Sequence, residues 1–556
     1  MIEIGTRPLE GETYMKALAL AVVVGLIAIV ASNAQPSVSA LQNNYSYVLP
    51  GMPNYGIAQG SIFVMYGKNM GPSQIASAQS FPLNKTLAGV AINVTGSDGK
   101  TYQAIPYYVS ATQSAAILPS STPTGNATIS VTYNSQTSAQ AQVAVVKTAF
   151  GILTLNGTGS GDAAAFDARN NYLGLINAAN PGEVVTLWGT GLGPAFGDET
   201  SVGGTAGDLG SNVPITVWVG GQQAAVQYHG RSQYPGLDQL NVVVPAGASG
   251  CSVSVVVQGG SMVSNFVTIP VAATGRVCSD MNGLPSSIVQ SLFAKGNFSI
   301  GFINLSKTTN FSTSGVPSDS AGAFFAQISS EFLTASGLGT QVSIGGCSLL
   351  VQNLPTPTTG LKYLDAGTVT LSPPSGSSVP FLKTDLPGVG PLYTIPGSQA
   401  SWIPASGGTF TFDNGAGGPS IGHFNTSMTL LAQNLVWTNI DQVADSVLAS
   451  TPPTLTWTGG DPDGFISVTG SSMMINGQAA TTTIFNCTVP PSAQKFTIPQ
   501  WVLLAMAPSA SVGGKPAGGL GINAWGQPQG FNVPSVDYAY HNWYVGSNKI
   551  VGYNNQ

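Results

Sequence analysis

Residues 182–194 read GEVVTLWGTGLGP, and residues 60–72 read GSIFVMYGKNMGP. Each stretch begins with a glycine and continues as an apolar, strand-like segment that ends at Trp or Tyr. Each stretch then closes with Gly-Pro. The stretch at residue 182 begins 122 residues after the stretch at residue 60. A repeat at this spacing has the size of a domain and is too long for a solenoid unit. The chain therefore contains a duplicated domain.

The glycines of the second stretch, Gly189, Gly191 and Gly193, also resemble a phosphate-binding loop. A dinucleotide loop opens a helix, and a P-loop continues into Gly-Lys-Ser or Gly-Lys-Thr. Here Pro194 follows at once, and no Lys is near. In the first stretch Asn69 replaces Gly191, and Asn and Gly are the residues that best tolerate a positive φ. We therefore expect a left-handed turn after a core strand and no nucleotide site.

The rest of each repeat consists of short strand-like runs about ten residues apart, separated by Gly, Asn, Ser and Pro, which is typical of an antiparallel sandwich. After residue 273 further strand-like runs follow, with one short helix expected at 286–296. The predicted fold class is all-β: tandem immunoglobulin-like β-sandwiches followed by a larger β-rich C-terminal region. The expected divisions are repeat 1 at 45–148, repeat 2 at 149–273, a β-rich domain at 280–400 and a C-terminal sandwich-like domain at 401–556. The region 280–556 can equally form one domain or two.

The paired motif and the stretch QLNVVVP (239–245) resemble the tandem immunoglobulin-like, IPT/TIG-like repeats of secreted acidobacterial proteins. Repeat 1 departs from that pattern, because Gln113-Ser114-Ala115 stands where the family has a Gln-Ile-Asn. Three later stretches are similar to a C-terminal module of such proteins: WTGGDPDGFISVTG (457–470), FNCTVPP (485–491) and FTIPQWVLLAM (496–506). The resemblance implies export and a β-sandwich fold. It implies no established activity and no catalytic residues.

Composition and the N-terminus indicate an exported protein. Only 7% of residues are charged, against about 25% in ordinary soluble domains, and the net charge is −6. Without a basic run the chain is not expected to bind nucleic acid. Lys16, an apolar run from Ala17 to Val30 and small residues up to Ala34 describe a cleaved signal segment at 1–34, with Met15 as the expected start. An uncleaved anchor is the alternative, but the apolar run is shorter than the roughly 20 residues of a spanning helix.

The cysteine count points to disulfides. Cys251, Cys278, Cys347 and Cys487 form an even set in an exported chain. Three pairings are possible. Cys251–Cys278 with Cys347–Cys487 is preferred, because the first pair then stays at the end of repeat 2 and the second stays within the region 280–556.

No residue pattern indicates catalysis or a cofactor. A G-x-S-x-G elbow is missing from the sequence, and the three histidines, His229, His423 and His541, are far apart. Asp461 and Asp463 could begin a calcium loop, but a strand follows at once, so an Asp-Gly hairpin turn explains them without a metal. We therefore expect no enzyme, no cofactor and no metal.

The C-terminal segment is rich in aromatic residues, and Trp525, Tyr540 and Trp543 are the candidates for stacking on sugar rings. The alternative to sugar binding is that these rings fill a sandwich core. The leading hypothesis is an exported, non-enzymatic surface or extracellular protein with a structural, adhesive or interaction role. Its expected partner is an extracellular protein or a polysaccharide. The alternatives are a carbohydrate-binding protein that uses the C-terminal aromatics and an extracellular hydrolase whose site the sequence does not reveal.

Overall fold

The structure is a computed structural model. The residues that it describes are 35–280, 285–312, 315–336, 342–352, 360–398, 402–432, 434–477 and 479–554. The predicted signal segment lies outside the described residues. Strands dominate the described chain, so the protein is all-β, as predicted. Within these residues we find no helix with the length and apolar character needed to span a membrane.

Repeat 1 is a sandwich of two sheets, with strand orders β1-β3-β9-β8-β4 and β2-β12-β10-β6-β5; in the second sheet β7 also pairs with β6, and β11 with β10. The strands are β1 (Ser37–Asn43), β2 (Ile57–Ala58), β3 (Ile62–Lys68), β4 (Ala76–Ser77), β5 (Thr86–Leu87), β6 (Val90–Thr95), β7 (Thr101–Gln103), β8 (Ile105–Val109), β9 (Gln113–Ile117), β10 (Gly125–Tyr133), β11 (Gln136–Thr137) and β12 (Ala141–Val146). Strand β1 precedes residue 45 but pairs with β3, so this sandwich takes in residues before the predicted start.

Repeat 2 is a second sandwich, with strand orders β13-β15-β20-β19-β16 and β18-β17-β21-β22; β14 pairs with β15, and β23 with β21. The strands are β13 (Gly151–Ile152), β14 (Ala165–Phe166), β15 (Val184–Thr190), β16 (Gly207–Asp208), β17 (Thr216–Val219), β18 (Gln222–Ala224), β19 (Val226–Arg231), β20 (Asp238–Val243), β21 (Gly250–Gly259), β22 (Met262–Val263) and β23 (Val267–Val271).

The duplicated motif forms strands β3 and β15, which occupy equivalent places in the two sandwiches. Each lies between two antiparallel neighbours, β1 and β9 around β3, and β13 and β20 around β15. After the strands the chain turns with a positive φ, 54° at Asn69 and 102° at Gly191. The predicted left-handed turn is confirmed in both copies.

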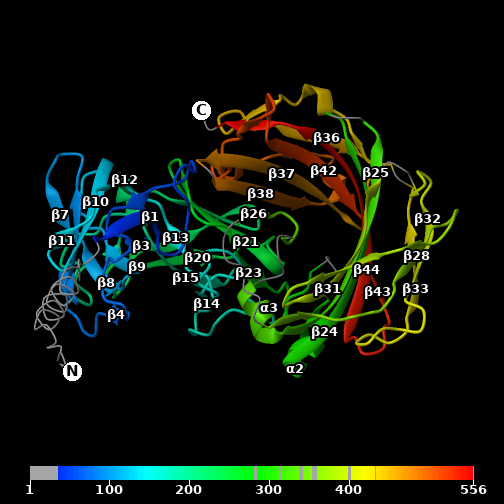
Figure 1. Ribbon diagram of the computed structural model, residues 1–556, viewed down its shortest axis with the longest axis horizontal. Coiled ribbons are helices and arrows are strands. Elements are labelled where there is room, and N and C mark those ends of the chain that lie inside the picture. The colour runs from blue at the N-terminus through cyan, green and yellow to red at the C-terminus, as the bar shows by residue number, and fades with distance from the viewer. Residues whose placement is uncertain are drawn as a thin grey trace, which may run out of the picture.

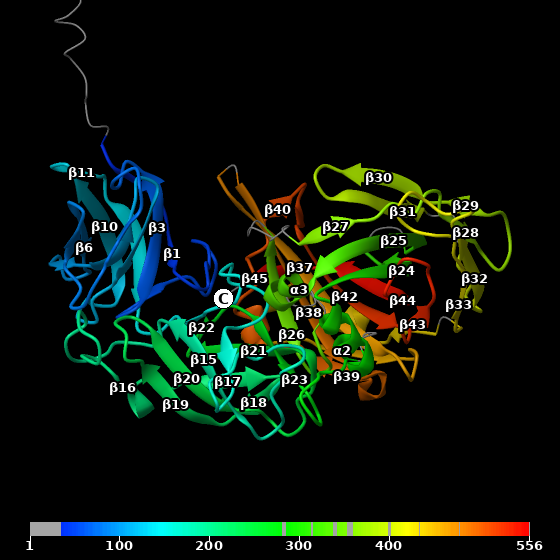
Figure 2. The same cartoon turned by 90° about the horizontal axis from the view of Figure 1, so that it is seen from below.

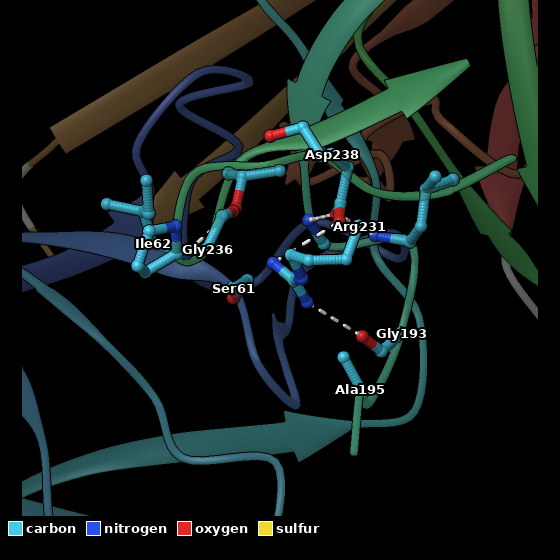
Figure 3. Close-up of polar contacts among 12 residues, drawn as sticks. Ser61, Ile62, Gly193, Ala195, Arg231, Gly236 and Asp238 are labelled. Carbon is cyan, nitrogen blue, oxygen red and sulfur yellow. Dashed lines mark hydrogen bonds and ion pairs between the residues drawn. The ribbon is translucent and has the colours of Figure 1, made fainter. Parts of the chain in front are cut away.

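The turn after β15 binds an anion, and that anion belongs to the same chain. Oδ2 of Asp238 accepts hydrogen bonds from the backbone N–H groups of Gly191 (2.7 Å) and Leu192 (2.8 Å). Oδ1 of Asp238 lies 3.2 Å from Nη1 of Arg231, and Nη2 of Arg231 donates to the carbonyl of Gly193 at 3.1 Å (Figure 3). The glycines therefore let backbone amides close around a buried carboxylate.

Polar contacts at this turn also join the two repeats. Oγ1 of Thr190 accepts a hydrogen bond from the N–H of Ile62 in repeat 1 at 2.8 Å. Nδ2 of Asn43, in β1, donates to the carbonyl of Thr190 at 3.0 Å. Nearby, the carboxylate of Glu199 accepts hydrogen bonds from the N–H and the hydroxyl of Ser120. Repeat 2 thus holds repeat 1 through buried and half-buried polar groups, at the junction seen in Figure 2.

An 11-stranded sheet dominates the C-terminal region, with the order β26-β38-β37-β42-β44-β24-β25-β31-β30; β27 pairs with β25, and β43 with β44. The strands are β24 (Asn297–Asn310), β25 (Pro317–Ser329), β26 (Cys347–Gln352), β27 (Leu361–Tyr363), β30 (Leu382–Leu386), β31 (Gly390–Ser398), β37 (Phe465–Asn476), β38 (Ala479–Val489), β42 (Gly518–Trp525), β43 (Gln529–Phe531) and β44 (Tyr538–Ile550). Because β24 pairs with β44 and β26 pairs with β38, the segments 280–400 and 401–556 share one sheet.

Smaller elements surround this sheet. They are β28 (Thr370–Ser372), β29 (Val379–Pro380), β32 (Gly408–Asp413), β33 (Asn425–Leu430), β34 (Val436–Trp437), β35 (Ser446–Leu448), β36 (Thr454–Thr458), β39 (Lys495–Thr497), β40 (Ser511–Val512), β41 (Lys515–Pro516), β45 (Gly552–Asn554), α2 (Ser286–Lys295), α3 (Ser330–Ser336) and α4 (Gln500–Leu503). Helix α2 confirms the predicted helix. The sheet β29-β28-β32-β33 and the sheet β34-β36-β39 both pack on one face of the 11-stranded sheet, and Figure 1 shows them outside its curve.

Repeat 2 and the C-terminal region share a hydrophobic core. Val256 and Phe266 of repeat 2 are buried in the same cluster as Ile466 and Trp501. The indole of Trp218 stacks on that of Trp501, with ring centroids 6.0 Å apart. The sheet β18-β17-β21-β22 of repeat 2 is therefore covered on both faces, by the other sheet of repeat 2 and by the C-terminal region.

Both predicted disulfides are present. Cys251–Cys278 ties the end of repeat 2 to the segment that follows it, and Cys347–Cys487 joins directly opposed residues of β26 and β38. The described residues contain no free cysteine. The preferred pairing is confirmed.

Candidate functional site

The two faces of the 11-stranded sheet differ in what they contact. Along β44, Ala539, Trp543 and Val545 pack into the core beneath the sheet β29-β28-β32-β33. Because side chains alternate along a strand, Tyr540 and Tyr544 point to the other side. We call this other side the concave face, because the sheet in Figure 1 bends around it while the smaller sheets lie outside the curve. The opposite side is the outer face.

The three predicted stacking residues are divided between these faces. Trp525 and Tyr540 lie on the concave face, where both are half-buried. Trp543 is 4% exposed and belongs to the outer-face core. Trp543 is therefore removed from the candidate stacking rings, since its position is one residue out of phase with Tyr540 and Tyr544.

The first aromatic group on the concave face centres on Trp525. Its ring stacks on Phe465 of β37, with centroids 5.6 Å apart and planes 11° apart. On the other side it contacts Tyr544 of β44, at 4.5 Å between centroids. Its indole Nε1 donates to Oγ of Ser467 at 2.9 Å. These contacts hold the indole in one orientation, so the group is a preformed platform.

The second aromatic group lies further along β44 and continues onto β24 and β25. Tyr540 packs on Phe302 at 5.1 Å between centroids, and Phe302 packs on Phe324 at 5.5 Å. Burial raises the pKa of Tyr540 to about 12, so its hydroxyl is neutral and able to donate a hydrogen bond at physiological pH. Helices α2 and α3 pack beyond this group, over Phe298 and Ala326, and close that end of the concave face.

Amides and hydroxyls fill the space between and beside the rings. Nδ2 of Asn304 donates to Oδ1 of Asn542 at 2.7 Å, between the two aromatic groups. Nδ2 of Asn523 lies 3.4 Å from Oγ of Ser467 and 3.3 Å from Oγ1 of Thr469. These groups combine donors and acceptors without a formal charge.

The charged residues of the sheet's described strands all lie on the outer face. Six residues of the sheet's described strands are Asp, Lys, Glu or Arg, and each takes an outer-face position by strand register: Lys307, Asp319, Lys362, Lys383, Asp385 and Lys549. Lys549, for example, donates to the carbonyl of Val443 at 2.7 Å on the outer side. The described strands therefore contribute no charged side chain to the concave face.

An open pocket of about 570 Å³ lies where β44 ends and β42 begins, beside the middle of β37. Its concave-face lining includes Thr469, Ser471, Gly519, Gly521 and Asn548. The side-chain oxygen of Asn548 is buried and has no hydrogen-bond partner among the described residues. The pocket therefore offers hydroxyl and amide groups above a glycine floor.

The calcium candidates lie in a turn, but the predicted hairpin is wrong: β36 before the turn pairs with β34 and β39, whereas β37 after it pairs with β38 and β42. Oδ1 of Asp461 accepts a hydrogen bond from the N–H of Asp463 (3.0 Å), and Oδ2 accepts one from the N–H of Gln527 (3.2 Å). Asp463 is exposed. Across the ranges that the structure describes, no three His, Cys, Asp or Glu side chains gather as metal ligands would.

The histidines lie apart in the fold. Nε2 of His229 is 2.9 Å from the carbonyl of Val213 in repeat 2, and His423 is exposed. His541 is buried on the outer face, where its ring stacks on Phe531 at 5.3 Å. Burial lowers the pKa of His541.

Sequence reasoning missed Phe302 and Phe324 as members of the aromatic groups, and it left Tyr544, one of the crowded C-terminal aromatics, out of the three preferred stacking residues. Tyr544 was within reach, because it continues the two-residue alternation of Tyr538 and Tyr540. Phe302 could not be predicted from the sequence, because it contacts Tyr540 only through the parallel pairing of β24 with β44. These two strands are separated by more than 200 residues of chain.

Comparison with known proteins gives no family. No family model matches the chain, and no curated protein matches it. Solved structures match the chain only at low TM-scores, as three of them show. The tetra-tandem repeat of the extending region of a large adhesion protein is 12% identical, covering 92% of this chain and 99% of that one, with a TM-score of 0.14. Titin domains A168–A170 are 11% identical, covering 72% and 99%, with a TM-score of 0.14. SGBP-B from a xyloglucan utilisation locus in Bacteroides uniformis is 9% identical, covering 83% and 99%, with a TM-score of 0.18. Likeness at these TM-scores supports no inference about function.

Proposed function

We propose that this protein is an exported, non-enzymatic surface or extracellular protein that binds a neutral polysaccharide on its concave face. The observation that carries the proposal is the separation of chemistry between the two faces of one sheet. The described concave face presents aromatic rings, amides and hydroxyls, while all six charged residues of the described strands lie on the outer face.

This combination suits sugars for two physical reasons. Aromatic rings pack against the C–H faces of a sugar, while amides and hydroxyls exchange hydrogen bonds with its hydroxyl groups. An uncharged face has no Coulombic attraction for phosphate, sulfate or carboxylate groups, so the ligand is expected to be neutral.

The non-enzymatic part of the proposal is supported by the same face. Most glycoside hydrolases use two carboxyl groups on either side of the scissile bond. The described inward positions of the sheet carry no Asp or Glu. A role in holding a polysaccharide therefore agrees better with this face than hydrolysis does.

Export is supported by two disulfides in a chain with a signal-like N-terminus. We further propose that the repeats are of the IPT/TIG-like kind found in secreted acidobacterial proteins, on the strength of the duplicated strand-and-turn motif. Recovery of the protein from the cytoplasm with free thiols would contradict export.

The test is a binding screen of the full chain against neutral polysaccharides, with an anionic polysaccharide in parallel. Trp525→Ala and Tyr544→Ala should each weaken binding of the neutral polymer by about tenfold, which corresponds to about 1.4 kcal/mol. Tyr172→Ala, an aromatic that is 60% exposed on repeat 2, is the matched control and should bind as the parent does. If no neutral polymer binds at millimolar concentration of sites, or if both variants bind like the control, the proposal is wrong.

A further inference from the structure

The concave face is longer than a single sugar needs. Tyr540 and Tyr544 mark the two aromatic groups and are four residues apart on β44, about 13 Å at about 3.3 Å per residue. From Tyr540 to Ile550, beside the pocket, the strand covers about 33 Å. The structure assigns this face to one extended polysaccharide chain, lying lengthwise across both aromatic groups and reaching the pocket. This inference rests on the proposed function, and adds the length and direction of the ligand.

Glycines keep a path open along the face. Gly322, on β25 beside Asn304, faces the concave side, and a Cβ built there meets no atom within 4 Å. On β42, a Cβ at Gly519 would first meet Oγ of Ser471, at 3.3 Å. Neither glycine has a positive φ, so backbone conformation does not require glycine at these positions. Above Gly322 the space is open to a ligand, and at Gly519 the missing side chain leaves room only up to the Ser471 hydroxyl.

Between the two aromatic groups the face is polar. The Asn304–Asn542 pair occupies this interval, and Ser306 and Ser320 lie beside it. A chain that stacked rings on both groups would therefore place intermediate hydroxyls over amides and hydroxyls. This alternation matches a polymer whose every unit has both an apolar ring face and polar edges.

The pocket beside the end of β44 is where the proposed polysaccharide site ends. It contains no aromatic ring, and its hydroxyl and amide groups come with the aliphatic side chains of Met473, Ile484 and Ile550. The half-buried hydroxyls of Thr469 and Ser471 can exchange hydrogen bonds with the hydroxyl groups of a ligand. A sugar at this end would be held by hydrogen bonds and packing, and the rings further along by stacking.

The experiment measures affinity against ligand length. Linear β-1,4-gluco-oligosaccharides of two, four and six rings are the first probe, followed by oligosaccharides cut from whichever polymer binds best. We expect affinity to rise at least about tenfold from two rings to six. Gly322→Leu and Gly519→Leu should each weaken binding of six rings by about fivefold or more, and leave binding of two rings within twofold.

Gly207→Leu is the matched control, because a Cβ there also meets nothing within 4 Å, on strand β16 of repeat 2. Thermal unfolding checks that all three variants remain folded. Affinity that is already maximal at two rings, or six-ring binding unchanged in both Gly322→Leu and Gly519→Leu, would overturn the lengthwise mode while leaving the proposed function intact. A complete lack of neutral-polymer binding would instead remove the proposed function.

Discussion

At the scale of single residues, the glycine-rich turn after β15 shows how a motif can mislead and still be informative. Its amides do bind an anion, but the anion is the carboxylate of Asp238, which is 0% exposed. Arg231, 2% exposed, balances that charge. The loop therefore has a structural role: the amide of Gly191 binds Asp238 of the same repeat, and Thr190 beside it bonds to Ile62 and Asn43 of repeat 1.

Replacing Asp238 should destabilise the protein strongly. Asp238→Asn leaves the Arg231 guanidinium buried without an anionic partner, a change that costs about 3–5 kcal/mol. Urea unfolding followed by tryptophan fluorescence measures the shift. Asp208→Asn, which removes a half-exposed carboxylate of the same repeat, is the control and should stay within about 0.5 kcal/mol. Equal stability of the two variants would show that the buried pair contributes little.

At the scale of elements, strand alternation decides which side chains share a face. The sequence places Trp525, Tyr540 and Trp543 in one cluster, but the strand separates Trp543 from the others because neighbouring residues point to opposite faces. Strand pairing decides which strands are neighbours in the sheet. The edge strand β26 is joined to β38 both by its ladder and by Cys347–Cys487, so this sheet edge has a covalent tie.

The two disulfides should differ in what they contribute. A chain-entropy estimate for the loops they close, 140 residues for Cys347–Cys487 and 27 for Cys251–Cys278, gives about 5 and about 3.5 kcal/mol. We therefore expect the Cys347→Ala/Cys487→Ala variant to have the lower urea midpoint. Reduction of the parent protein should lower the midpoint at least as far. A larger loss from Cys251→Ala/Cys278→Ala would show that local packing outweighs loop length.

At the scale of the whole molecule, the three parts depend on one another to different degrees. Repeat 2 contributes Val256, Phe266 and Trp218 to the core beneath β37 and β38. Repeat 1 touches the C-terminal region through a smaller cluster, in which Met52 packs with Met474. Repeat 2 is thus part of the support of the concave face, whereas repeat 1 extends from it.

Removing the repeats in turn tests this hierarchy. A fragment of residues 149–556 should keep a melting temperature near that of the full chain. A fragment of 280–556 should melt several degrees lower and bind a hydrophobic dye, because it exposes Trp501, and each buried large apolar side chain is worth about 1.5–3 kcal/mol. Differential scanning calorimetry of both fragments provides the measurement. Identical melting of the shorter fragment and the full chain would contradict a shared core.

The sequence by itself determined the all-β class, the duplication, the left-handed turns at Asn69 and Gly191 and the helix at 286–296. These features depend on local backbone preferences, or on residue patterns that recur within one chain segment. Only the tertiary structure decided that residues 280–400 and 401–556 share one sheet, that Trp543 is a core residue, and that Phe302 completes a surface with Tyr540. The physical reason is that pairing between distant strands such as β24 and β44 sets which side chains meet, and no local pattern records that pairing.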